Sequence, residues 1–147
     1  MNHEPLCILL VEDNAGDVRL TREALKDAKV QLDLYVASDG HQALDFLYRR
    51  GEYVNCRRPD LILLDLNLPC KDGREVLEEI KADSSLRSIP VIVLSTSSSS
   101  VDIHRSYQLH ANSYISKPVD LDGFLEIVRS IDNYWLSIVK LPKELSA

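Results

Sequence analysis

Asp-Leu-Ile-Leu-Leu-Asp-Leu-Asn-Leu-Pro, residues 60–69, is the stretch that decides the fold of this chain. Its apolar run, 61–64, is too short for an ordinary helix and has no polar face, which predicts a strand buried on both faces of a parallel sheet. The run ends in Asp65, and open α/β sheets bind their ligands at the carboxyl ends of central strands. An acidic turn residue or helix cap after a core strand is the alternative interpretation, because Asp and Asn are common in turns. The ends of the other strands must decide between the two.

Other segments of the chain repeat the same alternation of strand and helix. Residues 7–11 form a second apolar run, and 91–95, introduced by Pro90, also predict a strand. Residues 113–116 predict a short strand, and 32–37 alternate as an edge strand does. Helical spacing of apolar residues predicts helices at about 17–28, 41–50, 74–82 and 101–109, with a fifth from residue 120 or 121.

Strands that alternate with helices five times predict an α/β fold, a doubly wound (βα)5 flavodoxin-like architecture with a parallel sheet. The common strand order for such a sheet is 2-1-3-4-5, with its ligand site at the ends of strands one and three. The chain has 147 residues, the usual size of one domain. We therefore expect one domain over 1–147, with a short C-terminal extension at about 137–147 and no output domain.

Composition excludes several classes of protein. The net charge is −6 and no basic run is present, so neither nucleic acid nor an anionic membrane is an expected partner. No apolar stretch is long enough to cross a membrane, and the N-terminus lacks the basic start of a signal peptide, so a cytoplasmic location is expected. Cys7, Cys56 and Cys70 are odd in number and contain no CxxC motif, which argues against disulfides and a zinc site.

Polar side chains follow the predicted strands. Glu12 and Asp13 come after strand one, where they would meet Asp65. Three carboxylates at one edge of a sheet need a cation, and oxygen ligands with room for water suit Mg²⁺. The backbone carbonyl of Asn67 is a candidate for a further ligand.

Strands four and five add a hydroxyl, Ser95, and an ammonium, Lys117. This set suits phosphoryl transfer to a carboxylate oxygen, in which Asp65 is the nucleophile and Ser95 and Lys117 contact the phosphoryl oxygens. Taken singly these signals are weak, and their order along the chain carries the prediction. Neither GxGxxG nor GxxxxGK[ST] occurs, so a dinucleotide-binding fold and a P-loop enzyme are not supported.

The pattern resembles the receiver domain of two-component response regulators over essentially the whole chain. The motifs that carry the resemblance are Val11-Glu12-Asp13-Asn14, Leu64-Asp65-Leu66-Asn67-Leu68-Pro69, Ser95-Thr96 and Tyr114-Ile-Ser-Lys117-Pro118. The resemblance implies that Asp65 is the phosphoacceptor, and that Glu12, Asp13 and the Asn67 carbonyl bind Mg²⁺ with it. It also makes Tyr114 the aromatic switch residue, although an ordinary strand aromatic is the alternative. Glu12 and Ser95 replace the Asp and Thr that are commoner in the family, and both keep the required chemical group.

Finer details are similar to the small response regulators that pair with bacteriophytochromes and related sensor histidine kinases, including the cyanobacterial type. The segments that carry this similarity are Gly51-Glu52-Tyr53, Arg58-Pro59-Asp60, Lys71-Asp72-Gly73-Arg74-Glu75-Val76-Leu77, Trp135-Leu136 and Leu141-Pro142. They carry no chemistry of their own.

The leading hypothesis is thus a stand-alone phosphoacceptor switched by a sensor histidine kinase, and not an enzyme beyond its own phosphotransfer and slow hydrolysis. A phosphorylation-independent binding module is one alternative, and the intact Glu12, Asp13, Asp65 and Lys117 argue against it. An aspartate-nucleophile phosphatase is another, but Asn67 stands where such enzymes have a second acid.

The C-terminal end suggests self-association. Apolar residues run along helix five and continue beyond it: Phe124, Leu125, Val128, Ile131, Trp135, Leu136, Ile138, Val139 and Leu141. A receiver needs only one face of this helix, so we expect a homodimer through helix four, strand five and helix five, the surface on which Tyr114 lies. The alternative is a tail that folds back over its own domain.

Overall fold

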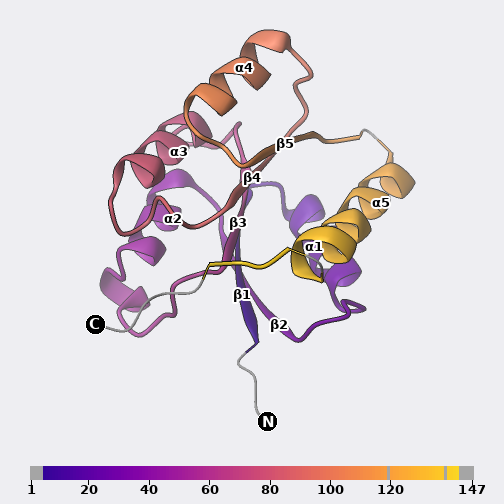
Figure 1. The fold of residues 1–147 in the computed structure, drawn as a ribbon, viewed down its shortest axis with the longest axis horizontal. Helices are drawn as coiled ribbons and strands as arrows, with labels where there is room; N and C mark the ends of the chain where they lie inside the picture. Colours follow the sequence, from indigo (N-terminus) through magenta and orange to yellow (C-terminus); the bar gives the residue numbers. More distant parts are fainter. Residues whose placement is uncertain (1–4, 119, 138, 143–147) are drawn as a thin grey trace.

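The computed structural model describes residues 5–118, 120–137 and 139–142. Strands and helices alternate along the chain (Figure 1). The elements are β1 (Leu6–Val11), α1 (Ala15–Leu25), β2 (Leu32–Ala37), α2 (Gly40–Leu47), the 3-10 turn η1 (Gly51–Tyr53), β3 (Leu61–Asp65), α3 (Gly73–Ala82), β4 (Val91–Ser95), α4 (Ser100–Gln108), β5 (Ser113–Ser116), α5 (Leu121–Ile131) and the π-helical turn η2 (Asp132–Leu136).

The five strands form one parallel sheet in the order β2-β1-β3-β4-β5, which confirms the predicted fold class and strand order. The order reverses between β1 and β3, whose carboxyl ends are aligned because Val11 pairs with Leu64. Residues that follow these two strands are therefore brought together at the switch point of the sheet.

Two apolar layers sandwich the sheet, and this explains the unbroken apolar runs. In β1, Ile8 and Leu10 pack with α1 and α5 on one face, whereas Leu9 and Val11 pack with α2 and α3 on the other. Figure 1 shows these helix pairs on opposite sides of the sheet. The side chains of β3 are buried throughout, as the sequence predicted, whereas β2 alternates because it lies at the edge.

Helix boundaries differ from the predicted ones for local reasons. Helix α1 begins at Ala15, two residues early, because the Asn14 side chain caps it by accepting from the Asp17 N–H at 2.9 Å. Helix α2 ends at Leu47 and not at residue 50, because Arg49 takes a left-handed conformation, with φ of 55°, that a right-handed helix does not allow.

The C-terminal end continues past α5 as η2. Leu136 is buried in the α1–α5 layer and Trp135 packs partly against it. The start of the tail therefore covers its own domain, while Ile138 and most of the predicted extension lie outside the described residues. Within the described residues, no helix has both the length and the apolar character needed to cross a membrane.

Candidate functional site

A polar hollow of about 470 Å³ lies at the carboxyl edge of the sheet. Its lining residues are Glu12, Asp13, Asn14, Ala15, Asp17, Asp65, Asn67, Thr96 and Lys117. The lining comes from the ends of β1 and β3, the start of α1, and the segments that follow β4 and β5. Most of the predicted site residues are thus brought together where the sheet topology places them.

Three carboxylates in this hollow form a candidate cation site. One oxygen each from Glu12, Asp13 and Asp65 lies within 4.8 Å of the others. Glu12 and Asp65 are buried and Asp13 is exposed, so the cluster opens to water on one side. Such a set of hard oxygen ligands fits a small divalent cation that keeps several waters.

Lys117 inserts its ammonium among the carboxylates. Its Nζ lies 3.1 Å from Asp65 Oδ2 and 3.1 Å from Asp17 Oδ2, and it also donates to Glu12 Oε2. The backbone N–H of Lys117 is anchored by a 2.6 Å hydrogen bond to the Ser95 carbonyl. These contacts compensate the buried negative charge and fix the ammonium beside Asp65.

Burial and pairing shift the pKa values of this pair. Burial raises the pKa of Glu12 to about 7, the Asp65 charge adds to the rise, and the hydrogen bond from Lys117 opposes it. For Lys117, burial lowers the pKa, but the hydrogen bond with Glu12 and the charges of Asp65 and Glu12 outweigh it and raise the pKa above its usual value. Lys117 is therefore a permanent cation of the site.

Asp65 is oriented by the loop that follows it. Its Oδ1 accepts a 3.0 Å hydrogen bond from the Asn67 N–H, which leaves Oδ2 for Lys117. Gly73 packs against the end of the strand so closely that a Cβ there would lie 2.3 Å from the Asp65 carbonyl oxygen. Gly73, at the start of α3, is thus part of what holds Asp65.

Ser95 and Tyr114 are joined through a residue between them. Ser95 is fully buried, and its Oγ accepts from the Ser97 N–H at 3.1 Å, while its neighbour Thr96 lines the hollow. The Tyr114 hydroxyl donates to the Ser97 carbonyl at 2.8 Å, and its ring packs against the core layer on the α2–α3 face of the sheet. Ser97 therefore contacts both predicted residues.

The sequence reasoning missed Asp17, Arg74 and Asp102. Asp17 contacts Lys117 although it lies outside the predicted acid pair. An acid in the first helical turn after a strand-end acid pair is the signal that points to it. Arg74 was assigned no chemistry, yet it forms ion pairs with Asp72 and Asp102. No local sequence pattern predicts the ion pair with Asp102.

Comparisons with known proteins agree with this geometry. The sequence model of the response regulator receiver domain matches residues 8–129. Response regulator Rcp1 of Synechocystis sp. is 48% identical over 141 residues, which cover 96% of this chain and 96% of that protein.

Solved structures are similar along nearly the whole chain. The phosphorylated cyanobacterial phytochrome response regulator RcpA is 51% identical, with a TM-score of 0.92 over 95% of this chain and 100% of that one. The Mn²⁺-bound form of response regulator Rcp1 is 49% identical, with a TM-score of 0.92 and the same coverage, 95% and 100%. The fold, the acidic cluster and these relatives agree, and the chain belongs to the response regulator receiver domain family of phosphoacceptor signalling proteins.

Proposed function

We propose that the chain accepts a phosphoryl group on Asp65 from a sensor histidine kinase, with Mg²⁺ as the cation. The observation that carries this proposal is the 3.1 Å contact between Lys117 Nζ and Asp65 Oδ2, whose side chains are only 5% and 9% exposed. A carboxylate held beside a buried ammonium can attack phosphorus while the ammonium balances the charge of the transferred group.

The transfer forms one bond and breaks another. An oxygen of Asp65 attacks the phosphorus, a new P–O bond forms, and the P–N bond to the kinase histidine breaks as the imidazole takes its electron pair. The hydrogen bond from Asn67 and the contact with Lys117 hold the carboxylate in place for this attack.

Glu12, Asp13 and Asp65 would hold the Mg²⁺, with the Asn67 carbonyl as a further ligand. Their clustered oxygens support the assignment, and the exposed side of Asp13 leaves room for the waters that Mg²⁺ retains. When bound, the ion supplies further charge neutralisation for the phosphoryl oxygens.

Ser95 and Tyr114 would convert phosphorylation into a surface change. We propose that the Ser95 hydroxyl donates to a phosphoryl oxygen and that Tyr114 responds. The supporting contacts both involve Ser97, whose N–H donates to Ser95 and whose carbonyl accepts from Tyr114. A shift of Ser95 toward the phosphoryl group would thus be transmitted to β5 and to the surface of α4 and α5.

The relatives favour a phytochrome-type histidine kinase as the partner. RcpA is described as a cyanobacterial phytochrome response regulator and shares 51% of its residues with this chain. We place the encounter in the cytoplasm, because Cys7, Cys56 and Cys70 are free thiols, as they would be in a reducing compartment.

We further propose a homodimer through α4, β5 and α5. The support is apolar surface that the monomer leaves exposed on α4, α5 and the adjoining η2. Val101 is 75% exposed and Tyr107 49% on α4, Leu121 is 51% exposed on α5, and Tyr134 is 55% exposed on η2. A twofold contact would bury this surface on both copies at once.

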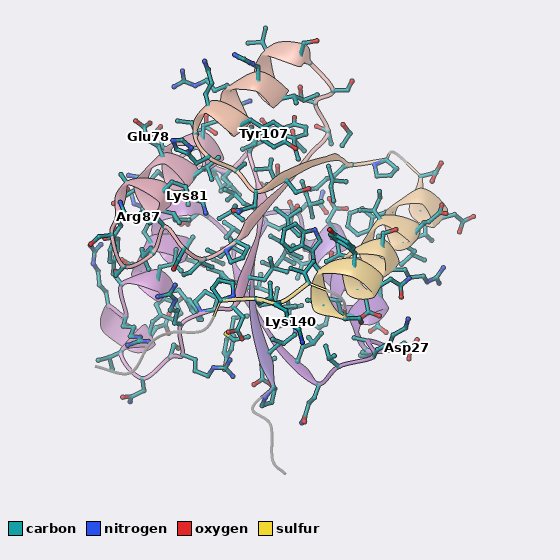
Figure 2. All side chains as sticks on the ribbon, in the orientation of Figure 1. Asp27, Glu78, Lys81, Arg87, Tyr107 and Lys140 are labelled. Carbon is teal, nitrogen blue, oxygen red and sulfur yellow. The ribbon has the colours of Figure 1, made fainter. Side chains whose placement is uncertain are left out.

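Phosphoryl uptake tests the main proposal. Incubation with acetyl phosphate and Mg²⁺ should add one base-labile phosphoryl group, detected by intact mass, and Asp65→Asn should abolish it because an amide cannot form the acyl phosphate. Asp27→Asn, an exposed site beyond α1, is the matched control and should be phosphorylated normally (Figure 2). Equal uptake by Asp65→Asn would show that the phosphoacceptor is another residue.

The partner is tested separately. Autophosphorylated phytochrome-type kinase should transfer its phosphoryl group to the chain faster than an unrelated histidine kinase at equal concentration. Equal rates would remove the phytochrome assignment and leave the phosphoacceptor assignment in place.

A further inference from the structure

We infer that Asp17 is a positioning residue of the site, which holds Lys117 in the unphosphorylated protein and opposes the arrival of the phosphoryl group. The inference rests on the proposed function and extends it to a residue outside the predicted set. Asp17 lies in the first turn of α1 and lines the same hollow as Asp65.

The ammonium of Lys117 has a limited hydrogen-bonding capacity. An ammonium has three protons to donate. In the structure Lys117 Nζ has three carboxylate partners, Glu12, Asp17 and Asp65. Lys117 can therefore donate to a phosphoryl oxygen only by giving up one of these partners.

Burial decides which partner is released. The side chains of Glu12 and Asp65 are 4% and 9% exposed, whereas that of Asp17 is 30% exposed. Unpairing a buried carboxylate costs far more than unpairing one that water can reach. Asp17 is thus the partner whose carboxylate water can stabilise once Lys117 turns to the phosphoryl group.

The hydrogen bonds at the start of α1 distinguish the positioning role of Asp17 from that of an acid that only caps its own helix. An acid at the third helical position commonly returns to the N–H of the capping residue, and it also interacts favourably with the helix dipole. Here the N–H of the cap, Asn14, donates instead to Glu12 Oε1 at 3.1 Å. The carboxylate of Asp17 turns to Lys117, 100 positions away in the sequence.

Charge gives the sign of the expected effect. The hollow gathers the carboxylates of Glu12, Asp13, Asp17 and Asp65 around one ammonium. An Asp17→Asn substitution removes one negative charge and weakens the hold on Lys117 without touching Asp65. Both changes favour an incoming anion, since like charges across a partly buried site repel.

The test uses beryllofluoride, a phosphoryl mimic, with the full chain at a Mg²⁺ concentration that saturates each variant. Titration followed by the backbone amide signal of Thr96 should show that Asp17→Asn binds about three- to tenfold more tightly than wild type. Asp27→Asn makes the same chemical change beyond the other end of α1 (Figure 2) and should leave the affinity unchanged. Asp17→Glu keeps the charge and should stay near wild type.

The outcomes separate this inference from the proposed function. Wild-type protein that neither binds beryllofluoride nor takes up phosphoryl would remove the proposed function itself. Wild-type binding with unchanged or weaker binding by Asp17→Asn would overturn only the inference, leaving Asp17 as a first-turn helix acid. Thermal melting checks the fold of each variant, and Asp17→Ser repeats the test if Asn is not tolerated. A variant that had lost its structure would not bind beryllofluoride more tightly, so misfolding cannot mimic the predicted gain in affinity.

Discussion

Arg74 Nη2 lies 2.9 Å from Asp102 Oδ1, and this ion pair joins the first turn of α3 to the first turn of α4. The other oxygen of Asp102 accepts a 2.7 Å hydrogen bond from Ser97 Oγ. The hydrogen bonds from Ser97 and Arg74 hold the pKa of Asp102 below its usual value. Since the Ser97 carbonyl also accepts from Tyr114, the start of α3 is connected to the predicted switch residue through Asp102 and Ser97.

Loss of the Arg74 side chain should therefore loosen α4 more than α3. We expect Arg74→Met to speed amide hydrogen exchange in residues 97–106 by about two- to fivefold, the range for a partly exposed ion pair. Arg87→Met changes an exposed arginine in the loop after α3 (Figure 2) and is the control. Unchanged exchange in Arg74→Met would show that the bridge does not restrain α4.

Gly73 provides a test of how the loop holds Asp65. A Cβ at this position would lie 2.3 Å from the Asp65 carbonyl oxygen and 2.6 Å from Leu66 Cα, both backbone atoms at the strand end. Gly73→Ala should lower the free energy of unfolding by about 1–3 kcal/mol, the usual cost of overpacking. It should also reduce phosphoryl uptake from acetyl phosphate, because Asp65 must shift.

Gly51→Ala is the control for this substitution. Gly51 has φ of +56°, but a Cβ at this position would have no neighbouring atom within 4 Å, so Ala there meets backbone strain without a clash. It should cost about 1 kcal/mol and leave phosphoryl uptake unchanged. Chemical denaturation measures both variants, and equal losses would mean that the close approach at Gly73 relaxes easily.

Lys81 makes stability depend on pH in the alkaline range. Lys81 lies in the last turn of α3 (Figure 2). Its Nζ donates to the carbonyls of Arg87 and Ile89 at 3.0 and 2.8 Å and to Asn112 Oδ1 at 3.0 Å. Burial lowers the pKa of Lys81 from 10.5 to about 8.

The folded chain therefore holds this proton less tightly than the unfolded chain. Below pH 8 both states are protonated, so the cost of the buried charge is fully present; it falls as pH rises through the folded pKa of about 8 toward the unfolded value of 10.5. Relative to Lys81→Met, the wild type should gain about 1–2 kcal/mol over that range in urea unfolding. A difference that stays constant with pH would contradict the lowered pKa.

The strands could be predicted closely because their side-chain patterns are plain: β4 is buried on both faces, whereas β2 alternates as an edge strand does. The bounds predicted for β2, β4 and β5 agree with the structure in full. Helix ends were less accurate, because they depend on single contacts. The Asn14 cap moves the start of α1, and the left-handed conformation of Arg49 ends α2. Neither can be inferred from apolar periodicity.

The site was predictable to the extent that sheet topology places residues. Strand ends must meet at one edge, so Glu12, Asp13, Asp65 and Lys117 could be gathered from sequence order alone. Sequence order does not predict the direction in which a side chain points. The contact between Asp17 and Lys117, and that between Arg74 and Asp102, join distant positions whose rotamers depend on the completed fold.

The proposed dimer is open to a direct test because its exposed apolar residues can be changed without disturbing the core. Val101 on α4 is 75% exposed, so an added charge there should be harmless to folding but should disrupt a twofold contact. Val54, 62% exposed in the loop after η1, is a matched position on elements outside the proposed interface.

Sedimentation velocity with and without beryllofluoride should show a dimer of the wild-type chain at micromolar concentration, a monomer for Val101→Asp and a dimer for Val54→Asp.

A chain truncated after Asn133 tests whether the C-terminal residues contribute to the dimer contact. Truncation removes Tyr134 and Trp135, whose rings pack edge to face with centroids 6.0 Å apart, and it also removes the buried Leu136. Its melting temperature must therefore be measured alongside its mass. A wild-type chain that stays monomeric at high micromolar concentration in both states would refute the dimer. A folded truncated chain that still dimerises would confine the contact to α4, β5 and α5.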